Sequence, residues 1–101
     1  MIVRWTDRAK TRLRLIHNRI SEHSVSTADK EIDKLLSSSA RLSELPHSGR
    51  KVPEYGQEDV RELLIKPYRL IYWILPDRID ILTVIHYRQH LDNQLTRLLS
   101  N

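Results

Sequence analysis

The sequence predicts a single α+β domain: an N-terminal strand and a helical hairpin packed on a small, mainly antiparallel sheet, ending in a short C-terminal helix or tail. Three observations predict this class. Apolar residues recur at helical spacing in the first half, residues 46–56 hold both glycines and two of the four prolines, and β-branched and aromatic runs follow. The chain has 101 residues, 40% of them hydrophobic. That is enough for one core and too little for two, so we expect one domain over residues 1–101.

The first elements are expected to be a strand and a basic helix. Residues 1–5 are rich in β-branched and aromatic side chains and predict the strand. Thr6 is a suitable N-cap for a helix over about residues 7–23. Six of the 17 Lys and Arg residues fall in the first twenty positions, where Asp7 is the only acid. This cluster is either a surface for an anionic partner or an ordinary solvated helix face.

A second helix is expected to pack against the first. Residues 24–27 interrupt the helical period and offer two caps, of which Ser26 stands three residues before Asp29, close to a capping box. The apolar stripe then continues to near Leu45, where Pro46 stops it. Two helices joined by about four residues form an antiparallel hairpin.

The second half predicts a meander of three antiparallel strands over residues 60–65, 68–75 and 79–86. The middle strand is apolar on both alternating faces and is expected to be central. Proline at the second position of the turn over residues 75–78 favours a hairpin there. The tail carries four leucines at helical spacing: Leu91, Leu95, Leu98 and Leu99. These leucines either pack on the sheet or form a surface that needs a partner, and the end is expected to fray alone.

Composition limits the classes of function. Without cysteine the chain has no disulfide, thiolate metal site or cysteine nucleophile. Its first eight residues carry charges, and no apolar run is long enough to span a membrane, so we expect a soluble cytoplasmic protein that does not contact membranes. The net charge of +4, with Arg as the commoner cation, suits an acidic or phosphate-bearing partner.

Five short motifs in this order resemble the ParE/RelE superfamily of toxins from bacterial type II toxin–antitoxin pairs, which include plasmid-stabilisation systems. They are Trp-Thr-Asp-Arg-Ala at residues 5–9, Leu-Pro-x-x-Gly-Arg at 45–50, Val-Pro-Glu at 52–54, the Arg-Glu-Leu and Tyr-Arg-Leu-Ile-Tyr pair within 61–72, and Val-Ile-His-Tyr-Arg at 84–88. The resemblance covers almost the whole chain and implies the fold described above.

The resemblance implies one of two activities, because the superfamily shares a fold and not a function. The RelE branch cleaves messenger RNA on the ribosome, and the ParE branch inhibits DNA gyrase. Of the residues that do the RelE chemistry, Arg69 and Arg88 match the two strand arginines. The resemblance also implies two closely spaced lysines on the second strand of RelE-like ribonucleases and a tyrosine in their tail. Here Arg61, Glu62 and Leu64 stand where the lysines are expected, and Gln94 stands near the position of the tyrosine. A glutamate at this point opposes the positive field that phosphate cleavage needs.

The favoured interpretation is therefore a ParE-like gyrase inhibitor without catalytic residues or cofactors. Its surface for the target or for a neutralising antitoxin is expected to include Arg50, Arg61, Arg69, His86 and Arg88. The alternative is a ribosome-dependent endoribonuclease in which Arg69 and Arg88 bind phosphate and His86 or His90 transfers protons. A third interpretation is an inactive relic of the family.

Each candidate residue also has a structural interpretation. For Arg69 and Arg88, an ion pair to Glu54 or Glu62 is an alternative of equal weight. His86 and His90 are four residues apart, but no third metal ligand is evident, so no metal site is expected. Trp5, Tyr72 and Trp73 are expected in the core, and Gly49 and Gly56 in turns. Helices on one face would leave the other face and the edges of the sheet exposed, which favours a toxin–antitoxin hetero-oligomer with an acidic antitoxin segment.

Overall fold

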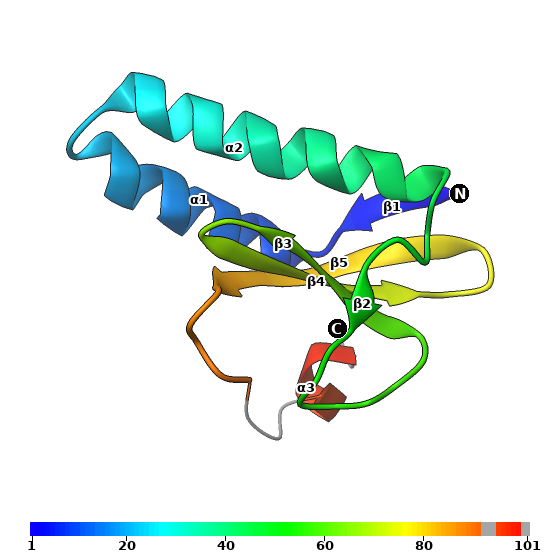
Figure 1. Cartoon of the computed structure of the whole chain (residues 1–101). Coiled ribbons are helices and arrows are strands. Elements are labelled where there is room, and N and C mark those ends of the chain that lie inside the picture. Colours follow the sequence, from blue (N-terminus) through cyan, green and yellow to red (C-terminus); the bar gives the residue numbers. More distant parts are fainter. Residues whose placement is uncertain (92–94, 100–101) are drawn as a thin grey trace.

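A computed structural model describes residues 1–91 and 95–99 of the chain. A five-stranded sheet in the order β1-β5-β4-β3-β2 lies beneath two long helices, α1 and α2, and the short helix α3 lies on its opposite side (Figure 1). The elements are β1 (Ile2–Trp5), α1 (Asp7–Ser21), α2 (Val25–Ala40), a 3₁₀ turn (Arg41–Ser43), β2 (Arg50–Lys51), β3 (Val60–Ile65), β4 (Tyr68–Ile74), β5 (Arg78–His86) and α3 (Leu95–Leu99). The predicted α+β class is confirmed.

Side-chain caps fix both ends of the helical hairpin. The Thr6 hydroxyl accepts from the backbone N–H of Ala9 at 3.2 Å and donates to the carbonyl of Ile81, which ties β1, α1 and β5 together. Ser24 caps α2 by accepting from Thr27 N–H at 3.1 Å, so the capping-box interpretation of Ser26 is wrong.

Both helices end a few residues earlier than the sequence predicts. The first helix ends at Ser21, not near residue 23. The second ends at Ala40 and continues as a 3₁₀ turn to Ser43, short of the predicted end near Leu45. The 3₁₀ turn redirects the chain toward the loop of residues 46–56 before it reaches Pro46.

Strands β3, β4 and β5 form the predicted antiparallel meander, with β4 between the other two. Two features lie outside the prediction. Strand β1 pairs parallel to β5, and the loop after α2 contains the two-residue strand β2, which pairs with β3. Pairs this short leave no period-2 pattern in the sequence. A register shift at Ile71/Tyr72 marks a bulge between β4 and β5.

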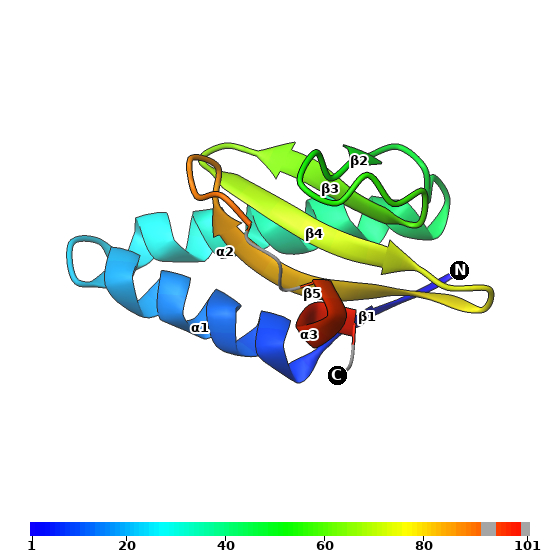
Figure 2. The same cartoon turned by 90° about the horizontal axis from the view of Figure 1, so that it is seen from below.

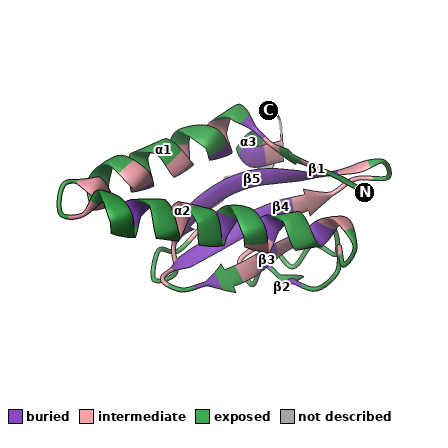
Figure 3. Cartoon of the chain, turned by 90° about the horizontal axis from the view of Figure 1, so that it is seen from above, coloured by how far each residue is buried: buried purple, intermediate pink, exposed green. Residues whose placement is uncertain are grey.

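One apolar core lies on each face of the sheet. The larger lies between the helices and the sheet and includes Leu35, Leu42 and Tyr72. Figure 3 shows that much of β4 and β5 is buried. The Tyr72 hydroxyl donates to the Pro46 carbonyl at 2.8 Å and accepts from the Gly49 N–H at 2.9 Å. A Cβ on Gly49 would lie 2.5 Å from the Glu62 carbonyl oxygen, so this close approach requires glycine.

The second core corrects the expectation that the opposite sheet face is bare. Val52 from the loop and Leu98 from α3 cover Ile71 and Leu82 on that face, and Trp73 packs against its border. Figure 2 shows α3 lying across β5 on the side away from the helical hairpin. Part of the leucine-rich tail therefore packs on the sheet. Gln94 lies outside the described residues, and no described helix has the length and apolar character needed to cross a bilayer.

Candidate functional site

A buried ion network lies across β2, β3 and β4 on the sheet face that α3 partly covers. The side chain of Glu62 on β3 is 0% exposed and accepts from Arg69 Nε on β4 and from Arg50 Nε on β2, both at 2.6 Å. Three neighbouring strands bring these groups together, because Glu62 pairs with Ile71 on one side and with Arg50 on the other. One carboxylate thus bridges two guanidinium groups inside the fold.

Arg69 extends this network to the loop and the tail. Its Nη1 and Nη2 donate to the two carboxylate oxygens of Glu54 at 2.8 Å, and Nη1 also donates to the Gln89 carbonyl at 2.9 Å. Glu54 also accepts from the Leu91 N–H at 2.8 Å. The network therefore holds the loop after β2 and the chain after β5 against the sheet.

The charges in this network stabilise one another. The hydrogen bonds from Arg69 lower the pKa of Glu54 to about 2, although burial opposes the shift. The same bonds to Glu54, with those to Glu62, raise the pKa of Arg69 above its ordinary value. Both side chains stay charged at neutral pH and neither offers a proton for acid–base chemistry.

The structure brings only part of the predicted set together. Arg50, Arg69 and His90 line one open pocket of about 310 Å³ with Glu54 and Tyr87. Arg61 faces away from this pocket and donates to the Gly49 carbonyl and to Glu58. Arg69, for which a surface ligand and an ion pair are equal alternatives from the sequence, is ion-paired with Glu54 and Glu62 and has 6% of its side chain exposed.

His86, Arg88 and His90 stand at the end of β5 and in the segment after it. The His86 ring lies 5.0 Å from the ring of Tyr87, and Arg88 lies over the Tyr87 ring at 5.4 Å. His90 is 83% exposed, with its Nδ1 3.6 Å from a Glu54 oxygen. In the part of the chain that the structure describes, no three His, Cys, Asp or Glu residues come together as a metal site.

Sequence reasoning underestimated Glu54, which is the second carboxylate of the network. In the sequence it is only the last residue of the Val-Pro-Glu motif and one of two candidate partners for an arginine. Its role depends on the loop of residues 52–56 folding back over β4, which no local pattern in the sequence signals.

The comparisons with known proteins agree with this fold. Residues 3–91 match the family model for the ParE toxin of the type II toxin–antitoxin system parDE. A solved structure described as the chromosomal ParDE toxin–antitoxin system from P. aeruginosa matches with a TM-score of 0.72 at 20% identity, covering 85% of this chain and 95% of that one. No curated protein matches the sequence.

Proposed function

The chain belongs to the ParE toxin family of type II toxin–antitoxin systems, and on that premise we propose that it arrests growth by binding and inhibiting DNA gyrase. It acts through surface contacts in the cytoplasm and makes or breaks no bond of its own. A cognate antitoxin binds it in a hetero-oligomer and neutralises it.

The state of Arg69 is the observation that carries this proposal. RNA cleavage needs cations that are available to a phosphate as negative charge develops on it. Here Nε, Nη1 and Nη2 of Arg69 are all taken by Glu54 and Glu62, and the neighbouring carboxylates repel a phosphate. This arrangement supports a binding protein over a nuclease.

One observation favours a second candidate, a ribosome-dependent mRNA endoribonuclease. Arg88 and His90 are exposed, and His86 is half-buried beside them at the end of β5. An imidazole titrates near neutral pH, and a nearby guanidinium binds phosphate. The experiments below therefore test both targets.

The first experiment adds the purified chain to gyrase and plasmid DNA. We expect blocked supercoiling or trapped cleavage complexes, both reversed by a molar excess of the antitoxin encoded beside the toxin. Heat-unfolded toxin is the control for non-specific inhibition. Unaffected gyrase at excess toxin would contradict the proposal.

The second experiment induces the chain in cells and in a reconstituted translation mixture. A gyrase inhibitor is expected to cause filamentation and leave messages intact. Cuts mapped by primer extension in translated messages, lost in Arg88→Ala, would instead establish the ribonuclease. Normal growth on induction would identify an inactive relic.

A further inference from the structure

Arg50 on β2 is held at one end of its guanidinium group and free at the other. Its Nε donates to the buried carboxylate of Glu62 at 2.6 Å, which fixes the orientation of the guanidinium plane. Among the described residues, neither Nη1 nor Nη2 of Arg50 has a hydrogen-bond partner, and 57% of the side chain is exposed. The fold therefore presents an oriented guanidinium with two unused donor groups.

The other arginines of the sheet strands are bound more completely. Arg61 and Arg69 each donate from Nε, Nη1 and Nη2 to groups of the chain. Arg4 and Arg78 each have an Nη group paired with an aspartate. Within the strands that the structure describes, Arg50 is thus the one arginine that keeps both Nη groups free for a partner.

Arg50 lines the open pocket of about 310 Å³ described above. Pro53 and Tyr87 give this pocket apolar contact surface, and Tyr87 is 41% exposed. Glu54 also lines it, but both oxygens of this carboxylate already accept hydrogen bonds from Arg69. The unused donors of the pocket therefore lie beside a proline and an exposed aromatic ring, a combination common at the centre of protein interfaces.

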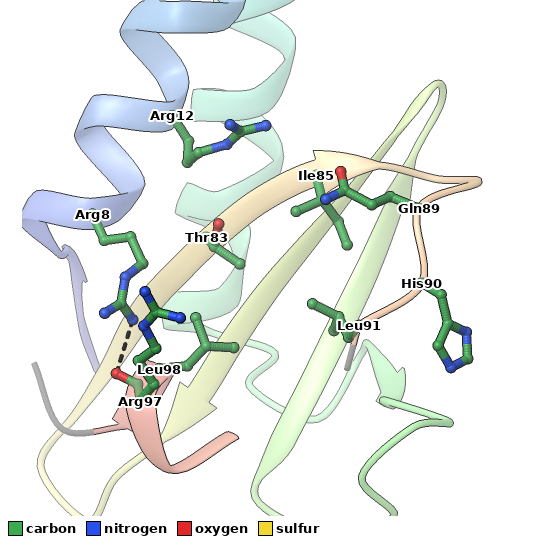
Figure 4. Close-up of a pocket in the computed structure, with 9 residues that line it drawn as sticks. All are labelled: Arg8, Arg12, Thr83, Ile85, Gln89, His90, Leu91, Arg97 and Leu98. Carbon is green, nitrogen blue, oxygen red and sulfur yellow. Dashed lines mark hydrogen bonds between the residues drawn. The ribbon is translucent and has the colours of Figure 1, made fainter. Parts of the chain in front are cut away.

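His90 lies between the pocket at Arg50 and a larger open pocket of about 440 Å³ beside α1, since it lines both. Arg8 and Arg12 project from α1 toward the larger pocket (Figure 4). Figure 4 also shows the His90 ring pointing away from these two arginines. The pocket at Arg50 is therefore a surface distinct from the one beside α1.

We propose that the pocket at Arg50 receives an aspartate or glutamate side chain from the surface of the toxin's target, gyrase. The carboxylate accepts one hydrogen bond from each Nη group of Arg50, in the bidentate geometry that a guanidinium favours. The apolar atoms next to that carboxylate pack on Pro53 and Tyr87. The inference rests on the proposed function, and it names the contact through which the toxin holds its target.

The local charge favours a protein carboxylate over a nucleic acid. Nucleic acids bind through many unpaired cations, whereas Glu54 and Glu62 balance the charges of Arg69 and Arg50 in this pocket. A single carboxylate needs only the two free Nη donors. Because Glu62 already holds the guanidinium in place, Arg50 loses little side-chain freedom when the carboxylate binds.

The test compares Arg50→Gln and Arg50→Lys with the wild-type chain. Glutamine removes the charge, whereas lysine keeps a cation beside Glu62 but cannot donate in bidentate geometry. We expect both variants to bind immobilised gyrase, free of DNA, at least about tenfold more weakly than the wild type and to inhibit supercoiling correspondingly less. If Arg50 served only to pair with Glu62, lysine would restore the affinity.

Two further variants locate the contact. Arg41→Gln is the matched control, because Arg41 is exposed in the 3₁₀ turn after α2, and it should change the affinity for gyrase by less than about twofold. Tyr87→Ala leaves the ion network of Glu54, Glu62 and Arg69 intact and should weaken gyrase binding by about fivefold. Thermal unfolding and binding to the antitoxin establish that each variant is folded.

Wild-type affinity for gyrase in Arg50→Lys would overturn the proposal. Weaker antitoxin binding by the Arg50 variants with unchanged inhibition of gyrase would assign the pocket to the antitoxin instead. Arg50-dependent binding of a DNA fragment that is tighter than binding to gyrase would assign it to nucleic acid.

The same variants separate this inference from the proposed function. Growth arrest that requires Arg50, with gyrase unaffected by the wild-type chain, would remove the proposed target and keep the contact. Equal inhibition of gyrase by the wild type and both Arg50 variants would remove only this inference.

Discussion

At the scale of single residues, burial decides what an arginine does in this protein. Arg69 and Arg88 match the same superfamily motif set, yet Arg69 has 6% of its side chain exposed and makes hydrogen bonds to two glutamates. Arg88 is exposed and lies over Tyr87. The first holds the fold together, and the second is available to a partner.

Replacing Arg69 by alanine should therefore lower stability strongly. The substitution leaves Glu54 and Glu62 buried without their main cation, which costs about 3–5 kcal/mol. Urea denaturation followed by circular dichroism measures the loss. Arg88→Ala is the matched control and should change the free energy of unfolding by less than about 0.5 kcal/mol. Equal losses in the two variants would show that the network contributes nothing.

Stability should also depend on pH through Glu54. Its pKa is lowered from 4.5 to about 2 in the folded chain, chiefly by hydrogen bonds from Arg69. A lowered folded pKa gives stability that is present above pH 4.5 and is lost as the pH falls toward 2, because between these two values the unfolded state binds the proton and the folded state does not. The free energy of unfolding should thus fall more steeply over this range in the wild type than in Glu54→Gln. Parallel curves for the two proteins would contradict the assignment.

At the scale of elements, some helices and strands follow from local sequence, and others depend on contacts between distant parts of the chain. The helical hairpin follows from periodicity and capping residues, and both caps form within three residues of the chain. Strand β2 and the parallel pairing of β1 depend on partners that are distant in sequence. The two candidate caps of α2 allow a direct test of the local rules.

Ser24→Ala should destabilise the protein by about 1 kcal/mol, because the Thr27 N–H loses its acceptor at the start of α2. Ser26→Ala should change stability by less than about 0.5 kcal/mol, since Ser26 lies within the first turn of the helix. Thermal unfolding of the two variants compares them. A larger loss for Ser26→Ala would restore the capping-box assignment.

At the scale of the whole molecule, the sheet has two covered faces and an uneven distribution of charge. The helices cover one face, and the loop and the tail cover part of the other. Most ion pairs of the described residues lie on the sheet, whereas the described arginines of α1 donate to carbonyl and hydroxyl oxygens. Leu98 of the tail packs in the second core and also lines an open pocket of about 440 Å³.

Leu98→Ala should show that the tail is part of the fold. Leu98 is 6% exposed and packs in the second core, so its truncation should cost about 2 kcal/mol or more. Leu64→Ala is the control, because Leu64 is 53% exposed and should cost less than about 1 kcal/mol. Equal and small effects on urea denaturation would mean that α3 does not pack on the sheet in solution.

Short stretches of sequence were enough to predict the fold class, the helical hairpin, the three-stranded meander and the superfamily, because these depend on periodicity, capping and local motifs. Three features emerge only in the folded molecule: Arg69 is bound by Glu54 and Glu62, part of the tail covers the second face, and residues 82–86 of β5 have no described strand on the side of β1. Each of these depends on segments far apart in sequence. Burial and pairing arise only when such segments meet, so the pattern within any one segment does not contain them.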